Sequence, residues 1–472
     1  MKPLTSGPVV ILGGGPAGLG AAYWLNRVGF SDWILYEREA EVGGLSRSFR
    51  DDHGFTWDIG GHVLFSHYAL FSRLMDELLG GEGWIEHERE SWVRVLETWV
   101  PYPFQNNLHR LPAEAGAECL EGLIQAALER RERRWANFEE FNRHTFGPGI
   151  NRLFMHPYNG KVWGYPPASL DADWIAERVA VPDPRRAARQ VALKTDDPSW
   201  GPNLRFRFPR WGGTGAIWKA LANRLPPGQI VTGAEAVALE VESRRVRFAN
   251  GQSVSYADLI TTIPLDQLTR ISNRPDWKEE ASRLSCTSTH VIGVGLKGTV
   301  PLELKSKCWM YFPESNCPFY RVTHFSHYSP NNVADIRQQW SLMAEVAESP
   351  QKPVDPNQVA EDTVRGLIAA GLLESSDQVH HTWTHFVKYG YPTPALGREK
   401  VVNRLLPALE ERRILSRGRF GAWRYEVSNM DHSFMQGVEA AAHLLFGTPE
   451  LTVWEPNLVN TFHPVLGWDR IR

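Results

Sequence analysis

The segment 9–37 constrains the fold of this chain more than any other stretch of its sequence. The apolar run 9–12 predicts a short buried strand, and the pattern G-x-G-x-x-G, from Gly13 to Gly18, follows it at once. An amphipathic helix and a second apolar run come next, and Glu37 stands about twenty residues past the glycine turn. This order of strand, glycine turn, helix, strand and acid predicts a Rossmann-like α/β unit that binds a dinucleotide.

The glycine turn and the acid suit a dinucleotide for separate physical reasons. Glycines allow the main chain to approach a pyrophosphate closely, and the helix that follows offers free N–H groups at the positive end of its dipole. Glu37 would accept hydrogen bonds from the ribose hydroxyls, and its charge would repel a 2′-phosphate. A glycine turn without a nucleotide is the alternative, and the complete set of accessory features argues against it.

The composition argues against several classes of function. A net charge of −3 over 472 residues gives no basic surface for nucleic acid, and the one dense charge run, at 129–134, mixes signs as the solvated face of a helix does. None of the four cysteines belongs to a C-x-x-C pair, so the sequence predicts neither a zinc site nor a disulfide framework. The first apolar run is too short for a signal peptide, and no stretch is long enough to cross a membrane. We therefore expect a cytoplasmic protein without membrane insertion.

Three histidines stand close together in the run H-H-T-W-T-H at 380–385. In a strand, His381 and His385 would share a face, but they would lie too far apart to bind one ion without further ligands. The sequence therefore predicts no metal site.

Two consecutive glycines mark a candidate pocket. After a second glycine turn at 42–46, the strand-like run 55–59 ends in Gly60, Gly61 and His62. Paired glycines let a flat ligand lie against the main chain. This context favours a pocket role for His62 over that of a hydrogen-bonded core histidine.

The segment 100–107, V-P-Y-P-F-Q-N-N, is a second candidate for ligand binding. Its prolines fix the backbone, so we expect an extended loop or edge. On an extended chain Tyr102 and Phe104 project to the same side, and Gln105 adds an amide with a donor and an acceptor. Such a set can stack on a flat heterocycle and read its edge. Ordinary packing of aromatic rings in a core is the alternative, and periodicity does not decide between the two.

The rest of the chain shows further elements. Helical periodicity from residue 112 to a Gly-Pro-Gly break at 147–149 indicates an inserted helical subdomain, and Gly and Pro crowd the stretch from 196, as in a mobile loop. An Asn-Gly pair at 250–251 predicts a hairpin, and the run 257–264 predicts a strand that returns to the first sheet.

Five strand-like runs between 285 and 390 predict a second sheet. We therefore expect an α/β fold with a Rossmann-like dinucleotide-binding domain, an inserted helical subdomain with the mobile loop, and a second, largely antiparallel sheet domain on the substrate side. Their expected segments are 1–100, 205–265 and 412–472 for the first, 101–204 for the second, and 266–411 for the third.

Blocks of sequence between residues 9 and 440 occur in the order known from one family. The first, VVILGGGPAGLGAAYWL, is common to many flavoproteins. The more specific blocks are FTWDIGGHVLFSHY, VPYPFQNN, PYNGKVW, RFPRWGGTGAIW and RFGAWRYEVSN. In this combination the chain resembles UDP-galactopyranose mutases of the eukaryotic type, in the amine-oxidase-like superfamily of FAD flavoproteins.

This resemblance implies a flavoenzyme with a net non-redox reaction. Members of the family convert UDP-galactopyranose to UDP-galactofuranose and are active only with reduced FAD, for which NADPH or NADH is the reductant. The implied mechanism passes through a covalent bond between the sugar and flavin N5, with UDP as the leaving group. The implied partner is therefore a UDP-sugar.

The resemblance also implies roles for residues of this chain. The implied catalytic residues are His62, Arg178, Arg321 and Asn203. The implied cofactor contacts are Gly13, Gly15, Pro16, Ala17, Gly18, Glu37, Arg38, Gly44, Leu45, Ser46, Gly61, His62, Val63, Val237, Arg419, Asn429 and Ser433. The implied substrate contacts are Phe65, Tyr102, Phe104, Gln105, Tyr158, Asn159, Trp163, Arg178, Asn203, Tyr311, Arg321, Tyr391 and Tyr425. The implied reductant contacts are Arg89 and Ser91.

Two departures from the family pattern leave the sugar open. His156 and Gly160 stand where the family carries an arginine and a bulkier aromatic residue, on either side of Asn159. The same chemistry on another nucleotide sugar, such as UDP-arabinopyranose, is therefore an alternative. Two other functions remain: an FAD-dependent oxidoreductase of the amine-oxidase type, and a non-catalytic protein that binds FAD and a UDP-sugar. The block YPFQNN and the two arginines argue against the oxidoreductase.

Overall fold

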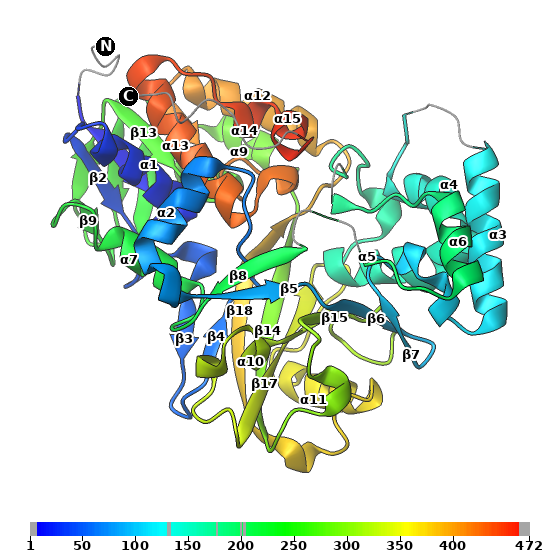
Figure 1. The fold of residues 1–472 in the computed structure, drawn as a ribbon. Coiled ribbons are helices and arrows are strands. Elements are labelled where there is room, and N and C mark those ends of the chain that lie inside the picture. Colours follow the sequence, from blue (N-terminus) through cyan, green and yellow to red (C-terminus); the bar gives the residue numbers. More distant parts are fainter. Residues whose placement is uncertain (1–6, 130–133, 176–177, 199–200, 202–203, 462–472) are drawn as a thin grey trace.

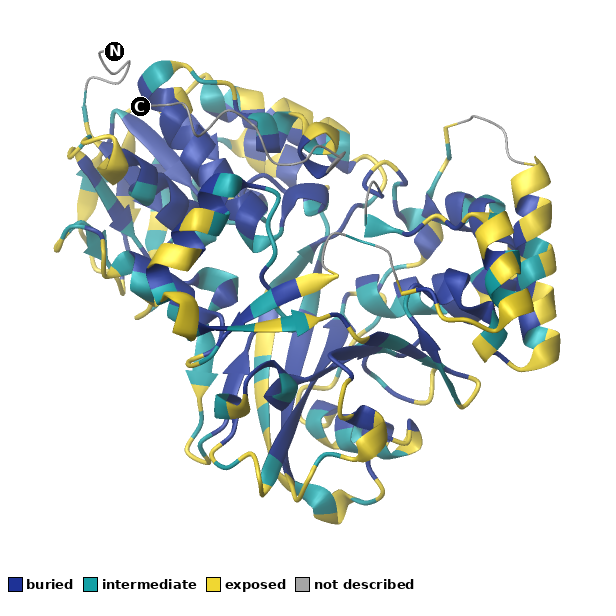
Figure 2. Cartoon of the chain, in the orientation of Figure 1, coloured by how far each residue is buried: buried dark blue, intermediate teal, exposed yellow. Residues whose placement is uncertain are grey.

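The computed structural model describes residues 7–129, 134–175, 178–198, 201 and 204–461. Its first sheet is parallel, with the strand order β19-β13-β1-β2-β9 (Figure 1). The strands are β1 (Val9–Leu12), β2 (Trp33–Tyr36), β9 (Ile230–Val231), β13 (Asp258–Thr261) and β19 (Ile414–Ser416). All four residues of the central strand β1 are buried, as expected of a parallel strand covered on both faces (Figure 2). The predicted Rossmann-like fold is confirmed, including the strand that returns near residue 260.

Two helices from opposite ends of the chain pack closely on one another beside this sheet. α1 (Pro16–Arg27) follows the glycine turn directly, and α13 (Met430–Phe446) comes late in the chain. A Cβ added at Gly437 would lie 1.8 Å from the main-chain oxygen of Ala17, so the contact admits no side chain there. The helix that completes this domain is therefore fixed against the helix that begins it.

Gly437→Ala is expected to destabilise the protein by about 3 kcal/mol or more, because α1 and α13 must move apart to admit one methyl group. Gly160→Ala is the matched control. Gly160 is also helical, but no atom lies within 4 Å of an added Cβ, so alanine should be neutral or stabilise by up to about 1 kcal/mol. Denaturant unfolding of both variants checks this, and equal midpoints would contradict the close helix contact.

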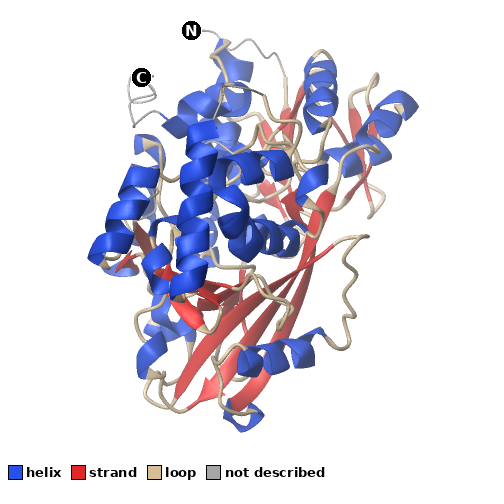
Figure 3. Cartoon of the chain, turned by 90° about the vertical axis from the view of Figure 1, so that its right-hand side faces the viewer, coloured by secondary structure: helices blue, strands red, loops and turns tan. Residues whose placement is uncertain are grey.

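The second sheet has the strand order β18-β14-β17-β16-β15-β6-β7. Neighbouring strands are antiparallel except β15 and β6, which run parallel. Along the sheet, the strands are β18 (Val379–Pro392), β14 (Cys286–Lys297), β17 (Gln339–Glu348), β16 (Arg321–His324), β15 (Trp309–Tyr311), β6 (Ser91–Val95) and β7 (Thr98–Pro101). Figure 3 shows its long strands side by side in the lower half of the molecule. The expected second, largely antiparallel sheet is therefore present.

The two sheets divide the chain differently from the expected segments in two places. β6 and β7 belong to the second sheet by hydrogen bonding, so that sheet takes in 91–101. Conversely, α8 (Leu265–Ile271), α9 (Pro275–Ala281) and α12 (Arg398–Glu410) bury apolar residues in a core that they share with the first sheet. Hydrophobic periodicity identifies an apolar face but does not specify the sheet or core against which that face packs, so it does not predict either change of boundary.

Helices of the middle third form a unit beside the second sheet, at the right of Figure 1. They are α3 (Ala113–Glu129), α4 (Phe138–Ile150), α5 (His156–Trp163) and α6 (Pro184–Leu193). The Gly-Pro-Gly break kinks α4 and does not end it: Gly147 has φ +75°, and a π-helical turn at 151–155 leads into α5. The expected helical subdomain is confirmed. Most of the charge run 129–134 lies outside the described residues.

A strand occupies part of the segment that was expected to be a loop. β8 (Arg205–Pro209) pairs antiparallel with β5 (Trp84–Glu88). The sequence R-F-R-F of β8 alternates, with both phenylalanines buried, which is the period of a half-buried strand. The strand pattern was present in the sequence, and the neighbouring glycines and prolines obscured it.

The other elements are short or peripheral. The remaining strands are β3 (Ser48–Arg50), β4 (Thr56–Asp58), β10 (Ala236–Glu240), β11 (Arg245–Phe248) and β12 (Ser253–Ser255). The remaining α-helices are α2 (Ala69–Leu79), α7 (Gly215–Ala222), α10 (Phe325–Tyr328), α11 (Val359–Ala369), α14 (Leu451–Trp454) and α15 (Pro456–Thr461). β11 and β12 form the predicted hairpin. Within the described residues, each helix is too short or too polar to cross a membrane.

Candidate functional site

The glycine turn after β1 forms a cradle, a space beside the main chain that any side chain at the glycine positions would fill. Gly13 has φ +102°, and a Cβ built there would lie 2.1 Å from Thr262 Oγ1, just after β13. A Cβ at Gly18 would lie 1.8 Å from the Gly13 carbonyl oxygen. Gly15 caps α1 without a side-chain hydrogen bond, so the N–H groups of the first helical turn remain for a ligand. This geometry fits the pyrophosphate of a dinucleotide.

Glu37 is buried at the end of β2, where the main chain holds its carboxylate. Oε2 accepts a hydrogen bond from Gly14 N at 2.6 Å, and Oε1 accepts one from Glu39 N at 2.9 Å. The second glycine turn packs against the first, because a Cβ at Gly15 would lie 3.6 Å from Gly44 Cα. The structure thus brings the predicted ribose-binding acid and both glycine turns together.

Two of the expected cofactor contacts lie on the surface near this acid. Arg38 is exposed and pairs with Glu39 at 3.1 Å, and Val237 is exposed at an irregularity in the pairing of β10. The N–H of Ala234, just before β10, donates to the carbonyl oxygen of Glu37 at 2.8 Å. Both surface residues therefore lie at the rim of the cradle.

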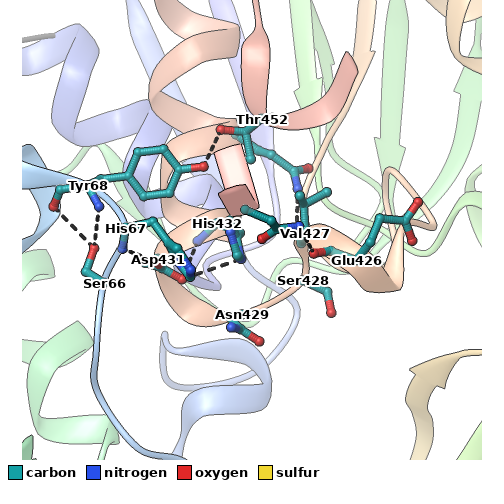
Figure 4. A network of polar contacts seen from close by, with 12 residues as sticks. Ser66, His67, Tyr68, Glu426, Val427, Ser428, Asn429, Asp431, His432 and Thr452 are labelled. Carbon is teal, nitrogen blue, oxygen red and sulfur yellow. Dashed lines mark hydrogen bonds and ion pairs between the residues drawn. The ribbon is translucent and has the colours of Figure 1, made fainter. Parts of the chain in front are cut away.

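A network of polar contacts holds the N-terminus of α13 (Figure 4). Asp431 is buried, and its Oδ2 accepts a hydrogen bond from His67 N at 3.0 Å and lies 3.0 Å from His67 Nδ1. Burial would raise the pKa of Asp431, but His432 and the contacts from His67 hold it well below its usual range. Asn429 caps the helix without a side-chain hydrogen bond to the first turn. His432 N, in that turn, donates to Asp431 Oδ1 at 2.8 Å, so the N–H groups before it are the ones left for a cofactor.

Two guanidinium groups meet at that end of α13. Arg178 donates from Nη1 to Asn429 Oδ1 at 3.1 Å and from Nη2 to the Glu426 carbonyl oxygen at 3.0 Å. Arg419 donates from Nε and Nη2 to the carbonyl oxygen of Gly390, at 3.1 and 3.0 Å. Arg178 lies over the ring of Tyr425 and Arg419 over that of Tyr391, each at 4.8 Å from the centroid, and the two rings are 5.8 Å apart. Burial lowers the pKa of Arg419, and the charge of Arg178 also lowers it.

A third guanidinium, on Arg321 in β16, is held by a carboxylate that no sequence motif marks. Its Nε and Nη2 donate to the two carboxylate oxygens of Glu345 in β17, at 2.8 and 2.7 Å. Glu345 also accepts hydrogen bonds from Tyr320 Oη at 2.6 Å and from Gly61 N at 3.1 Å. Burial would raise the pKa of Glu345, but Arg321 and these hydrogen bonds lower it, so the carboxylate is ionised. Glu345 thus connects Arg321 to the glycine pair before His62.

His62 lies among these charged groups. Burial and the charge of Arg419, partly offset by Glu345, lower the pKa of His62 to about 4, and Arg321 contributes in the same direction. The imidazole is therefore neutral at pH 7, and its Nδ1 is buried without a hydrogen-bond partner among the described residues. Together with Arg178, three guanidiniums converge on this part of the molecule.

A series of aromatic rings runs from the second sheet into the helical unit. Tyr102 contacts Tyr311, Tyr311 contacts Tyr158, and Tyr158 stacks on Phe154, with centroid distances of 5.2, 5.2 and 5.1 Å. Phe104 is fully buried and stacks on Phe154 at 5.0 Å. The expected extended backbone is wrong at Phe104, which begins a 3₁₀ turn and enters the core. Tyr102 and Phe104 therefore belong to the same row of rings but join it at different points, Tyr102 through Tyr311 and Phe104 through Phe154.

Gln105 is buried beside these rings and presents a free acceptor. Its Nε2 donates to the carbonyl oxygen of Ala180. Its Oε1 is buried and has no hydrogen-bond partner among the described residues. An unpaired buried carbonyl is costly unless a ligand supplies the donor. An N–H group on a heterocycle would satisfy it.

Further expected substrate residues pack in the same cluster. The rings of Trp163, Tyr391 and Tyr425 contact one another edge to face, with centroids 4.9 to 5.9 Å apart. Asn159, one helical turn before Trp163, is buried and donates to a main-chain carbonyl at 2.7 Å. The hydroxyl of Tyr391 lies 3.5 Å from that of Tyr320, which links this cluster to the carboxylate of β17.

The expected reductant contacts lie beside Tyr102. The guanidinium carbon of Arg89 is 5.8 Å from the centroid of the Tyr102 ring, and Nη2 donates to the Pro198 carbonyl oxygen at 2.8 Å. Ser91 begins β6, and its Oγ is buried without a partner among the described residues. The structure therefore brings both residues to the edge of the aromatic cluster.

Other singled-out residues lie elsewhere. Phe65 lines a cavity of about 600 Å³ together with residues of β5 and β8. His156 is exposed and pairs with Glu139 at 2.7 Å, while Gly160 lines a second cavity of about 680 Å³. Of the two departures from the family pattern, His156 thus lies on the surface and Gly160 lies at that second cavity. Asn203 lies outside the described residues.

The chain is similar to several known proteins. The family model for flavin-containing amine oxidoreductases matches residues 16–445. A crystal structure of reduced UDP-galactopyranose mutase is 46% identical, with a TM-score of 0.94 over 97% of this chain and 98% of that chain. A candidate protoporphyrinogen oxidase from Exiguobacterium sp. 255-15 is 17% identical, with a TM-score of 0.69 over 91% of this chain and 98% of that chain, and shares the fold alone.

A curated relative matches a shorter part of the chain. The thiamine thiazole synthase of Saccharolobus islandicus is 30% identical over 115 residues, which are 24% of this chain and 37% of that protein. The chain thus matches little more than a third of the length of such relatives.

Proposed function

The chain belongs to the family of flavin-containing amine oxidoreductases and, within it, to the UDP-galactopyranose mutases, and from this premise we propose that it converts UDP-galactopyranose to UDP-galactofuranose. It is a flavoenzyme with FAD as its cofactor. The proposal includes that only reduced FAD supports the reaction, that NADPH or NADH reduces it beside Arg89 and Ser91, and that the protein works in the cytoplasm.

The observation that carries the proposal is that Arg178, Arg321 and Arg419 gather around the contacting rings of Tyr391 and Tyr425 and the neighbouring Tyr320–Glu345 pair. These three partly buried guanidiniums outnumber the ionised carboxylates of this region, those of Glu345 and Asp431, which leaves an excess of positive charge. This excess suits a diphosphate and disfavours a cationic amine, the substrate of an amine oxidase. The charge balance therefore favours a mutase over an oxidase in this shared fold.

The aromatic cluster adds what a uracil base requires. Gln105 Oε1 is an unpaired acceptor for the N3–H group, and the neighbouring rings offer faces for stacking. Burial raises the pKa of Tyr311 and of Tyr391, so both hydroxyls stay protonated and can donate to phosphate oxygens. A UDP-sugar fits all of these features.

The chain's own residues would assist the departure of UDP. When bound, reduced FAD supplies the nucleophile for the anomeric carbon of the sugar. Arg178 and Arg321 would stabilise the negative charge that the diphosphate gains as its bond to the sugar breaks. Neutral His62 adds no further charge at pH 7.

A direct assay tests the proposal. Purified protein should show the yellow spectrum of bound flavin, and after reduction, chromatography should show interconversion of UDP-galactofuranose and UDP-galactopyranose. Oxidised protein should show none. Reduced, flavin-loaded protein without interconversion would overturn the proposal, and hydrogen peroxide released from an amine would favour the oxidase. A panel that includes UDP-arabinopyranose identifies the preferred sugar.

A further inference from the structure

Three histidines cluster where the β3–β4 hairpin meets the start of β18. His53 comes from the hairpin, and His380 and His381 from β18; one ring nitrogen of each lies within 4.8 Å of the others. His381 is about 30 Å along β18 from Tyr391, which lies in the aromatic cluster. We propose that these three imidazoles bind one Zn²⁺ ion, at a site separate from the catalytic one.

The cluster has the donor set that zinc prefers. Three imidazole nitrogens with water in the fourth position form a common Zn²⁺ environment. The ring centroids are 4.3 Å apart for His53 and His381, 5.1 Å for His53 and His380, and 5.6 Å for His380 and His381. Nitrogens on one tetrahedral zinc are about 3.3 Å apart. His53 and His380 are exposed, so rotation of these two rings can close the remaining gap.

Asp51 supports the cluster from behind. Its Oδ2 lies 2.6 Å from His381 Nε2 and accepts a hydrogen bond from Trp57 Nε1 at 2.7 Å. Its Oδ1 accepts from the main-chain N–H groups of His53 and Phe55 at 3.0 and 2.9 Å, which fixes the hairpin tip. Since Asp51 engages Nε2, the His381 nitrogen left for the ion is Nδ1, which is buried without a hydrogen-bond partner among the described residues. A carboxylate on the other nitrogen of a ligating imidazole is a usual feature of zinc sites, because it orients the ring and makes it a stronger ligand.

The sheet leaves room for the ring of His381. Gly295 faces His381 in the β14–β18 ladder, and a Cβ there would lie 2.8 Å from the ring.

A zinc ion here would join the hairpin to the second sheet. β4 leads from the hairpin to Gly61 and His62, but the ion itself would lie far from the reacting groups. We therefore expect an effect on stability and none on turnover.

Equilibrium dialysis tests the proposal on flavin-loaded protein that has first been freed of metal by a chelator. Wild-type protein should bind one Zn²⁺ per chain in the micromolar range, and its Tm should rise until that one site is filled, because a ligand of the folded state stabilises it. His53→Asn and His380→Asn alter exposed side chains, and each should weaken Zn²⁺ binding about tenfold or more. Flavin content and turnover should stay at wild-type values.

His385→Asn is the matched control, because His385 lies on the same strand but outside the cluster. It should bind Zn²⁺ as the wild type does. Absence of micromolar binding by the wild type would overturn the proposal. So would binding that survives the combined loss of His53 and His380, since that would place the ion on scattered surface histidines.

Discussion

Arg321→Lys is expected to lower kcat/KM by about 100-fold in the reduced enzyme. Arg321 directs Nε and Nη2 to Glu345, so a planar guanidinium can hold that carboxylate and still present N–H groups to a diphosphate. Lysine keeps the charge but has one ammonium, which cannot serve both partners with the same geometry. Steady-state kinetics with UDP-galactofuranose measures the loss, and Arg178→Lys should behave alike.

The surface variant Arg337→Lys is the control for this substitution. The Arg337 side chain is 84% exposed and, among the described residues, pairs with Asp335 only, so the kinetics of this variant should match the wild type. The flavin spectrum of Arg321→Lys should also be unchanged, because Arg321 bonds to Glu345 and not to the glycine turns that would hold the cofactor. Wild-type turnover in Arg321→Lys would mean that this arginine does not act on the diphosphate.

Glu345→Gln is expected to destabilise the folded protein by about 3 kcal/mol or more and to reduce activity with it. An amide of the same shape would leave the partly buried Arg321 guanidinium without its buried counter-charge. Glutamine also places an NH₂ group where Tyr320 Oη and Gly61 N already donate. Denaturant unfolding of the flavin-loaded protein measures the change.

The loss of stability caused by Glu345→Gln should become smaller at acidic pH. Burial would raise the pKa of Glu345, but Arg321 lowers it below the value in the unfolded chain. Its contribution to stability is therefore complete above about pH 4.3 and is lost as the pH falls through the folded-state pKa. The stability difference between wild type and variant should stay constant from neutral pH to that range and shrink below it. Exposed Glu361→Gln should change stability by less than about 0.5 kcal/mol, and equal losses in both variants would contradict the buried pair.

Short-range patterns suffice for the cofactor side of the site. The glycine turn, the strand before it and Glu37 lie within one βαβ unit, whose period and spacing are local properties of the sequence. Backbone chemistry also identified the hairpin at 250–251. The same reasoning predicted a loop where β8 begins, because the nearby Gly and Pro residues outweighed the alternation of polar and apolar residues in this strand.

The substrate side depends on contacts between distant segments. Glu345 is a lone acid within the apolar run of β17, which already implies a buried partner. That the partner is Arg321 follows from the register between β16 and β17, which no local pattern specifies. Phe104 illustrates a different cause. The prolines that precede it in the sequence favour an extended backbone, but the packing of Phe104 on Phe154 stabilises a 3₁₀ turn instead.

The strand order of the first sheet also decides when a newly made chain can complete it. β1 is synthesised first, but its neighbour β13 ends at Thr261, and α13, which packs on α1, ends only at Phe446. During most of its time on the ribosome the chain therefore carries apolar β1 and α1 surfaces without their partners. Such surfaces attract chaperones and other unfinished chains. Because α13 packs on the helix that follows the glycine turn, we expect stable loading with flavin only after Phe446 has been synthesised.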